Sequence, residues 1–536
     1  MSVGAYAYVL QNQKAIATNI EQQARYSDIL YIWTDCDREG ENIGAEIREI
    51  AVKANPRLDV RRARFSNTER NHVIQAAQNP DTLDESQADA VSARIEIDLR
   101  TGAAITRQLT LNLRPMVPDL VAEKKIISYG SCQFPTLGFV VDRYFRVKNF
   151  VPEPFWFIRV LHKKDDKTVT FNWKRVHLFD RLAVVIMYER CLNSKFATVT
   201  KMQTKPASKW KPLPLTTVEL QKMGSRFLHM NSSRVMKVAE DLYTKGFISY
   251  PRTETDRFDP GIDLKALIQK QTQSSNWGGF GQGLLNGGFQ RPRDGRNDDK
   301  AHPPIHPVNY VAPSVLNQEE QRVYEFVVRR FLACCSEDAR GERTTIEIEY
   351  GGEIFQTSGT IVMQRNYLDV YPYDKWESGQ ELPQYAVGET FVPTEALMKE
   401  GKTSPPKYLT EPELIDMMDK NGIGTDATMA EHIAKIKERN YVQIRQVSRT
   451  SISEDGDDDD DAVGAGRRGG RGGRGGRGGS GRGGTTNGVS RSRGTVDEFI
   501  PTTLGVALIE GYDNLEFDTS LSKPFLRKEV RFGVLS

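Results

Sequence analysis

The sequence has few cysteines and no long apolar run. Only five of its 536 residues are cysteine, an odd number, and no two of them form a CxxC pair. This pattern argues against a disulfide framework and against a zinc ribbon, so we expect no zinc and a reducing compartment. No apolar stretch approaches membrane-spanning length, and the start, MSVGAYAYVLQNQ, lacks the basic and apolar parts of a signal peptide. We therefore expect a soluble intracellular protein with no membrane partner.

A strong net charge and a nucleotide-triphosphate motif are also absent. Lys+Arg 73 against Asp+Glu 71 gives a formal charge of +2, which neither indicates nor excludes a nucleic-acid partner because the charges lie in separate blocks. The string GAGRRG at 464–469 matches GxGxxG, but no strand precedes it and no helix follows. Gly401-Lys402-Thr403 resembles the end of a P-loop, yet the first glycine is missing and two prolines follow. We predict no ATP site.

The chain is long enough for three or four domains. The apolar run 28–34 predicts a buried strand, and an acidic loop and a helix over 42–53 follow it. This is the α/β unit in which sites lie at the carboxyl end of a strand. Strand-like segments occur at 155–162, 167–174, 197–203, 343–350 and 354–363. Helical spacing occurs at 70–79, 85–107, 319–335, 411–420, 427–439 and 503–511. Strands thus bracket a helical block that begins near Pro212, which predicts one β domain interrupted by an inserted helical domain, with a loop-dominated stretch at 256–312.

One segment has the composition of a disordered loop. Residues 454–461 carry a run of acids, and residues 466–484 repeat Arg-Gly-Gly. Such a segment cannot form a core. The RGG repeats are suited to single-stranded nucleic acid, through charge and guanidinium stacking. A solvated linker whose two charge blocks neutralise each other explains the composition equally well.

Alternating acids follow the first predicted strand. Asp35, Asp37 and Glu39 occupy the loop, where alternate side chains project together and oxygen ligands can hold a hard cation. A DxDxE pattern alone is more often surface acidity, but the apolar strand before it favours a metal site. We predict Mg²⁺ at these three residues.

A tyrosine close to an arginine is the most informative feature of the chain. Tyr250 lies two residues before Arg252 in the run SYPRTET, which follows a helix predicted to end at Gly246. A fixed cation beside a phenol favours phenolate character and binds phosphate oxygens, so we predict a tyrosine that attacks a phosphodiester. Glu254 adds to the polar crowding, and His302 is a candidate phosphate ligand or proton donor. A half-buried aromatic and an ordinary loop histidine are the simpler interpretations if the two do not meet.

Four motifs in order resemble those of type IA DNA topoisomerases, most closely the eukaryotic topoisomerase III subfamily. The run 34–44, TDCDREGENIG, resembles the TOPRIM signature, and SYGSCQFPT at 128–136 resembles the start of the DNA-contacting helix. SYPRTET at 249–255 resembles the active-site tyrosine motif, and GIGTDAT at 422–428 resembles a signature turn of the helical base. The resemblance covers nearly the whole chain apart from the acidic/RGG insert.

The resemblance implies a multidomain α/β and α+β chain with the toroidal fold. A partial TOPRIM domain and a helical domain form the base, a β domain forms the arch, and winged-helix-like domains include the gate that carries the tyrosine. The expected domains are TOPRIM 1–66, helical base 67–150, arch 151–211, tyrosine gate 212–338, arch 339–395, and helical base 396–536 with a disordered insert at 451–494.

The resemblance also implies the chemistry. Tyr250 would attack single-stranded DNA to give a 5′-phosphotyrosine and a free 3′-hydroxyl, another strand would pass, and the hydroxyl would reverse the reaction without ATP. Arg252 and His302 would stabilise the phosphoryl charge, with Glu254 as a further catalytic residue, while Mg²⁺ at the acidic loop would serve religation. The predicted DNA-binding residues are Ser128, Tyr129, Gly130, Ser131, Cys132, Gln133, Arg94 and Arg100.

Two departures from the family pattern lead to a further expectation. The family's TOPRIM domain opens with a strand that bears a glutamate and a nearby lysine, and only a short helical stretch separates Met1 from the strand at 28–34. After Arg527 the family continues with a long helix, and some members add zinc modules, whereas this sequence ends at Ser536. We expect a truncated form that is catalytically poor by itself, and vigorous relaxation of negatively supercoiled plasmid would overturn this expectation.

Alternatives and partners complete the predictions. Another TOPRIM protein, such as a primase or nuclease, would not need Tyr250, and an inactive paralogue would bind single strands without cutting them. The resemblance suggests a RecQ-family helicase and a small OB-fold protein as partners, with 256–300 as a docking surface, and a nuclear location. Removal of supercoils or decatenation in recombination and repair is the expected task.

Overall fold

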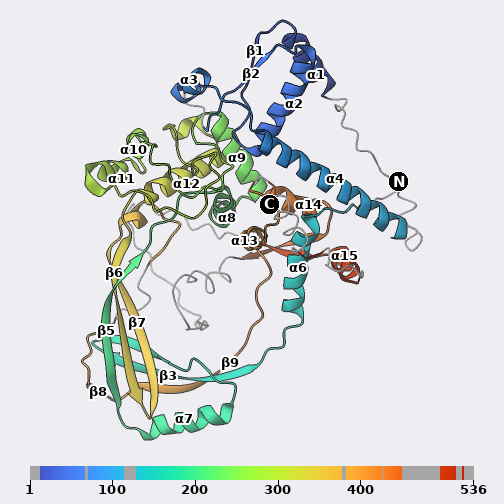
Figure 1. Ribbon diagram of the computed structural model, residues 1–536. Helices are drawn as coiled ribbons and strands as arrows, with labels where there is room; N and C mark the ends of the chain where they lie inside the picture. Colours follow the sequence, from blue (N-terminus) through green and yellow to red (C-terminus); the bar gives the residue numbers. More distant parts are fainter. Residues whose placement is uncertain are drawn as a thin grey trace, which may run out of the picture.

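The computed structural model describes residues 13–66, 70–113, 128–376, 382–426, 428–448, 495–514 and 522–523. These residues form a ring of four parts, which is the toroidal fold expected (Figure 1). A small α/β part lies at the top of the view, a helical base at the right, a curved sheet at the bottom left, and a helical gate closes the ring between sheet and base. Among the described residues, no helix combines the length and the apolar character that crossing a bilayer would require.

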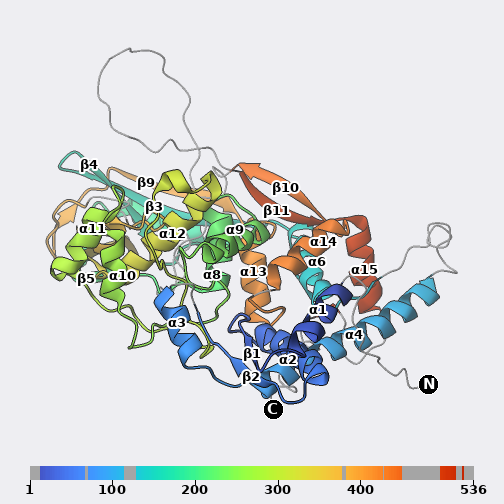
Figure 2. The same cartoon turned by 90° about the horizontal axis from the view of Figure 1, so that it is seen from above.

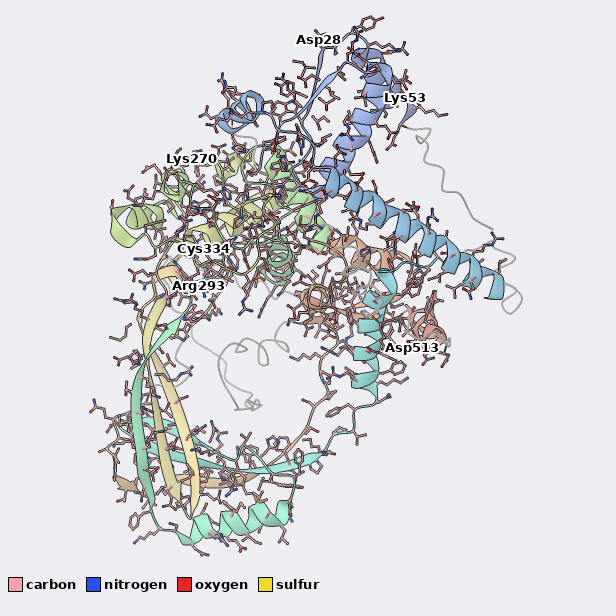
Figure 3. All side chains as sticks on the ribbon, in the orientation of Figure 1. Asp28, Lys53, Lys270, Arg293, Cys334 and Asp513 are labelled. Atoms are coloured by element: carbon pink, nitrogen blue, oxygen red, sulfur yellow. The ribbon has the colours of Figure 1, made fainter. Side chains whose placement is uncertain are left out.

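The α/β part confirms the predicted strand, loop and helix. Its two strands are parallel, with Ile29 opposite Asp59. Ala24, Ala51 and Leu58 form a small buried cluster between the helices and the sheet. Its elements are α1 (Lys14–Ala24), β1 (Ile29–Ile32), α2 (Arg38–Ala54) and β2 (Asp59–Arg62), followed by α3 (Arg70–Gln78). In Figure 3, Asp28, just before β1, and Lys53, in the last turn of α2, lie on the side of this part that faces away from the ring.

The base combines a long helix from the first half of the chain with helices from the last third. Phe134 and Leu137 are fully buried among Ile415, Ile433 and Phe499, so segments far apart in sequence share one core. The elements are α4 (Glu85–Leu113), α6 (Gln133–Lys148), α13 (Glu411–Lys420), α14 (Met429–Glu438), β10 (Val442–Ser448), β11 (Thr495–Pro501) and α15 (Thr503–Asp513). The antiparallel pair β10–β11 was not predicted. The whole of the predicted insert, 451–494, lies outside the described residues.

The arch is a seven-stranded sheet in the order β8-β5-β6-β7-β4-β3-β9. Pro154 pairs with Lys402 at its edge, so the arch continues past the predicted boundary at 395, and that boundary was wrong. The unexpected helix α7 (Arg181–Asn193) covers the far end, where Val184 and Cys191 pack on the sheet. The strands are β3 (Pro154–Lys164), β4 (Lys167–Trp173), β5 (Ala197–Lys209), β6 (Ala339–Tyr350), β7 (Glu353–Gln364), β8 (Thr390–Phe391) and β9 (Glu395–Lys402).

The gate is inserted between β5 and β6, as predicted. Its helices enclose an apolar core that also takes in Tyr367 and Leu368, from the turn that follows β7. The stretch 256–312 is less loop-like than expected, because two helices and a π-turn lie within it. The elements are α8 (Thr217–Phe227), α9 (Ser232–Thr244), α10 (Leu264–Gln271), α11 (Gly278–Gly283), η1 (Leu284–Gly288), η2 (Pro313–Val315), α12 (Gln318–Cys334) and η3 (Asn366–Asp369). Cys334 and Arg293 lie where the gate joins the arch (Figure 3).

Candidate active site

The acidic loop is shaped by a helix cap and a buried arginine. Asp37 caps α2, and its Oδ1 accepts a hydrogen bond from the Gly40 amide at 2.7 Å. A side chain at Gly40 would place its Cβ 2.0 Å from the Asp35 carbonyl oxygen, so only glycine allows the loop to turn this closely. Arg62 is fully buried and donates to the carbonyl oxygens of Thr34 and Asp35 at 2.7 and 2.6 Å. The carboxylate of Glu41 balances this arginine at 2.9 Å and is therefore structural.

The tyrosine segment is held extended by the gate around it. The buried hydroxyl of Thr217 donates to the Pro251 carbonyl oxygen at 2.8 Å and accepts from the Thr253 amide at 2.6 Å. On the other side, the Ser249 amide donates to the carbonyl oxygen of His306 at 2.9 Å. These bonds fix the backbone on both sides of Tyr250, so its ring has a defined direction.

The two halves of the site meet at the Tyr250 hydroxyl. This hydroxyl donates to Asp37 Oδ2 at 2.7 Å, across 213 positions of sequence. The Tyr250 amide donates to the Ser66 carbonyl oxygen at 3.1 Å, and the residue is only 5% exposed. The structure thus brings the phenol and the acidic loop together, as the sequence predicted.

The charge state of the phenol differs from the sequence expectation. Burial, the carboxylates of Asp37 and Asp35, and the hydrogen bond to Asp37 raise the pKa of Tyr250 far above its usual value. Arg252 acts in the opposite direction but is outweighed, and its guanidinium is held by Glu240 at 2.6 Å. The expectation of phenolate character in the resting enzyme was therefore wrong, and the phenol is a neutral donor to Asp37.

His302 lies against the tyrosine ring. The two ring centroids are 4.7 Å apart, and Nδ1 of His302 lies 3.6 Å from Asp299 Oδ2. Although burial opposes it, hydrogen bonding from His302 and the nearby backbone amides lowers the pKa of Asp299, which keeps this carboxylate charged. Within the described part of the chain, the buried Nε2 of His302 has no hydrogen-bond partner. A buried polar atom without a partner at this position is suited to a ligand oxygen.

The predicted magnesium ligands are only partly together. Burial and then Asp37 raise the pKa of Asp35, so two carboxylates share a site with too little positive charge to balance them. Oxygen ligands with excess negative charge fit a hard divalent cation. The carboxylate of Glu39 is instead ion-paired with Arg94. No group of three possible ligand residues is found in the described ranges, so Glu39 as a third ligand stays a prediction.

The predicted DNA-contacting motif lies at the start of α6. Ser131 Oγ donates to Asp98 Oδ1 at 2.9 Å, and Arg439 donates to Gln133 Oε1 at 2.7 Å. Ser128, Gly130, Ser131 and Gln133 are partly exposed, whereas Tyr129 and Cys132 are buried in the base core. Ion pairs hold the two predicted arginines, Arg94 to Glu39 and Arg100 to Glu96. Tyr129 and Cys132 therefore shape the motif from within, and their contact with DNA stays a prediction.

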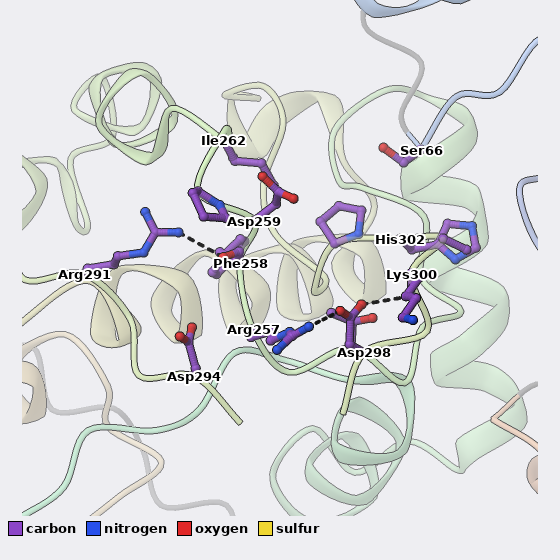
Figure 4. A pocket seen from close by; sticks show the side chains of 14 residues that line it. Ser66, Arg257, Phe258, Asp259, Ile262, Arg291, Asp294, Asp298, Lys300 and His302 are labelled. Carbon is purple, nitrogen blue, oxygen red and sulfur yellow. Dashed lines mark hydrogen bonds and ion pairs between the residues drawn. The ribbon is translucent and has the colours of Figure 1, made fainter. Parts of the chain in front are cut away.

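A cavity of about 630 Å³ opens beside His302 (Figure 4). Apart from Ser66, its lining comes from gate residues 255–303, with Arg257, Arg291 and Lys300 opposed by Asp259, Asp294 and Asp298. Its volume is that of a small-ligand site. Glu254 is exposed, and its backbone amide donates to Asp299 Oδ2 at 3.3 Å. Its catalytic role stays a prediction.

Sequence reasoning missed three side chains around the tyrosine. Glu240 orients Arg252, Asp299 faces His302, and the Tyr243 ring lies edge-on to Tyr250 with centroids 5.2 Å apart. Asp299 stands three residues before His302, a spacing that could have indicated a pair. Glu240 and Tyr243 share one face of α9 at an i, i+3 spacing, but nothing local relates that face to the tyrosine segment.

Comparisons with known proteins agree with this geometry. A family model described as DNA topoisomerase matches residues 82–457, and a Toprim domain model matches residues 6–68. DNA topoisomerase 3 of Schizosaccharomyces pombe is 47% identical over 523 residues, covering 97% of this chain and 77% of the relative. Human DNA topoisomerase 3-alpha is 45% identical over 523 residues, covering 98% of this chain and 47% of the relative.

A solved structure supports the architecture independently. Full-length topoisomerase I from Thermotoga maritima superposes with a TM-score of 0.65 at 23% identity, covering 81% of this chain and 70% of that one. At that identity the likeness shows the fold alone. Taken with the family models and the identities above, it places this chain in the topoisomerase III group of the type IA DNA topoisomerases, a family of isomerases.

Proposed function

We propose that Tyr250 cleaves one strand of DNA through a 5′-phosphotyrosine and that the chain religates the strand after another strand has passed. This proposal rests on the hydrogen bond from the Tyr250 hydroxyl to Asp37. The bond joins the gate to the α/β part, which we call the TOPRIM part because the Toprim domain model matches it. A buried phenol that donates its hydrogen bond to a carboxylate can lose its proton to that carboxylate as it reacts. Relaxation of negative supercoils and decatenation follow from repeated cycles.

The geometry supports a definite proton path. The phenolic oxygen attacks phosphorus while its proton moves to Asp37, the P–O3′ bond breaks, and the departing O3′ takes up a proton from water to become a hydroxyl. Religation runs the same step backwards, so the phosphodiester bond is conserved and no ATP is needed. Because Tyr250 has a raised pKa, the resting site protects the phenol from ionising before DNA is bound.

Two groups are placed to stabilise the charge on phosphorus. His302 lies against the Tyr250 ring and has a buried Nε2 available for a phosphate oxygen. Arg252 is held in position by Glu240 and supplies a fixed cation. The adjoining cavity offers room for the nucleotide next to the scissile phosphate.

Asp35 and Asp37 are the residues that would hold Mg²⁺, with Glu39 as a third ligand if Arg94 releases it. The cation would supply positive charge near the 3′ end during religation. Without it, Asp37 still accepts the hydrogen bond of the Tyr250 hydroxyl.

The wider biological role is a proposal by resemblance. Recombination and repair in the nucleus, with a RecQ-family helicase and a small OB-fold protein as partners, fit a topoisomerase III. Deletion of 262–298 would test the proposed docking surface, since complex formation that survives the deletion would discard it.

The direct test is covalent trapping of a labelled single-stranded oligonucleotide on the purified chain, with and without Mg²⁺. We expect a protein–DNA adduct that disappears in Tyr250→Phe, which keeps the ring and loses only the hydroxyl. An adduct that persists in this variant would refute the assigned nucleophile. Salt-sensitive binding with no adduct would instead favour a single-stranded DNA-binding paralogue.

A further inference from the structure

The gate is joined covalently to the rest of the ring only through the arch. Its two ends continue into β5 and β6, where Lys209 and Ala339 are directly paired. The turn η3, which packs on the gate core, follows β7 of the same sheet. All contacts of the gate with the base and with the TOPRIM part are therefore noncovalent. The ring can open at these contacts without breaking the chain.

Several polar contacts join the gate to the base, and we call this set the seam; beside it, Val218 of α8 packs against the base core. Figure 2 shows α13 beside α8, with α9 and α14 next to them. The seam contacts join Lys222 to Asp416 at 3.0 Å, the Gln221 amide to the Asp426 carbonyl oxygen at 3.0 Å, Ser233 Oγ to the Ala430 carbonyl oxygen at 3.3 Å, and Ser232 to Glu411.

Glu411 differs from the other seam residues because its carboxylate is buried. It is 3% exposed, and its partner Ser232 is 1% exposed. Oε1 of Glu411 accepts from the Ser232 amide at 2.8 Å and from Ser232 Oγ at 2.5 Å, and Oε2 accepts from Lys437 of the base at 3.1 Å. Ser232 and Glu411 are the first residues of α9 and α13, so two helix N-termini adjoin one negative charge.

We propose that the buried carboxylate of Glu411 is the latch that holds the gate closed against the base, a role that rests on the proposed strand-passage function. When the gate parts from the base, Glu411 keeps Lys437 and loses both bonds from Ser232. The first amide of α9 then needs water as its acceptor. The half-buried pair Lys222–Asp416 changes less, because water reaches both of its charges.

The test is the separation of gate and base in solution, measured on the full chain. All five cysteines are buried, so spin labels on Lys237→Cys of α9 and Glu431→Cys of α14, both exposed positions, report this distance selectively. We expect Glu411→Gln to increase the open population about tenfold, since the two hydrogen bonds from Ser232 lose their charged acceptor. Ser232→Ala should give a smaller increase in the same direction. The matched control Asp416→Asn, at the half-buried ion pair of the same seam, should change the open population less than about twofold.

Two outcomes separate this inference from the proposed function. Unchanged label distances in both Glu411→Gln and Ser232→Ala would overturn the latch. If Glu411→Gln does not fold, Ser232→Ala decides alone, because it removes a single hydroxyl. Oligonucleotide cleavage should stay the same in both variants, since neither residue contacts the Tyr250 site. Failure of the unaltered chain to cleave would count against the proposed function and would leave the distance comparison valid.

Discussion

The interior of the gate and the contacts of the gate with its neighbours differ in polarity. The gate core is apolar, with Leu220, Leu242 and Phe326 fully buried. The gate meets the base and the TOPRIM part mainly through hydrogen bonds and an ion pair, with an apolar contact from Val218. Apolar burial makes the gate a rigid unit, because exposing that surface to water is costly. Hydrogen bonds across a seam can be exchanged for bonds to water at small net cost. The difference fits a part that moves as one body and separates where its contacts are polar.

The largest effect is expected at Asp37, which accepts the phenol proton where the gate meets the TOPRIM part. Asp37→Asn keeps a side chain that can cap α2 but cannot take up that proton. We expect cleavage of a single-stranded oligonucleotide to slow about a thousandfold, in the range found for loss of a general base. Single-turnover cleavage in EDTA measures this step apart from religation. A rate equal to that of the unaltered chain would exclude Asp37 as the base.

The core side of the comparison is tested on α9, which carries both kinds of residue. Leu242→Ala removes a fully buried side chain and should lower the free energy of unfolding by about 3 kcal/mol. Ser233→Ala, on the seam face of the same helix, should cost less than about 1 kcal/mol. Chemical denaturation of both variants gives the ratio. Equal losses would mean that the seam contributes to stability as the core does.

Removal of the negative charge of Asp35 should stabilise the metal-free protein. Burial and then Asp37 raise the pKa of Asp35 above its usual value of 3.8. At a pH just above 3.8, the folded protein therefore retains a proton that the unfolded chain has lost. This group's contribution to stability therefore falls as the pH rises above that value. At neutral pH in EDTA, Asp35→Asn should melt a few degrees higher than the unaltered chain. Mg²⁺ should raise the melting temperature of the unaltered chain and leave that of the variant almost unchanged, and an equal response would remove Asp35 from the metal site.

His306 should produce the smallest effect, a loss of stability in acid. Burial lowers its pKa from 6.5 to about 4, so the unfolded chain takes up a proton that the folded gate refuses. Stability is therefore lost as the pH falls from 6.5 toward 4, by about 1 kcal/mol at pH 5.5. Thermal melts of His306→Gln between pH 7 and 5 should show a shallower pH dependence. The same slope in both proteins would assign acid sensitivity to other groups.

The sequence predicted best what is local. The strand, acidic loop and helix around Asp37 follow from an apolar run, a capping residue and helical spacing, all within thirty residues of one another. The insertion of the gate into the β domain was also visible, because strand-like composition returns after the helices. The short helix α10 was missed because it lies within a stretch rich in Gly, Pro, Asn and Asp, and α11 was missed because glycine occupies most of its positions.

The site was predicted less completely, because its electrostatics arise from tertiary contacts. Tyr250 and Arg252 were identified from their motif, but the partner of each was not. Asp37 reaches Tyr250 and Glu240 reaches Arg252 from other elements. Burial and then Asp37 raise the pKa of the phenol, against the expected phenolate character. The edge strand β9 pairs with β3 across more than two hundred residues, a relation that no local pattern encodes.

Mass spectrometry of the digested protein–DNA adduct tests the central claim most directly. After reaction with a single-stranded oligonucleotide and nuclease trimming, the peptide that contains Tyr250 should carry a nucleotide through a phosphodiester to the phenolic oxygen. A nucleotide on any other residue, or an unmodified Tyr250 peptide where a related full-length enzyme gives the adduct under the same conditions, would contradict the account.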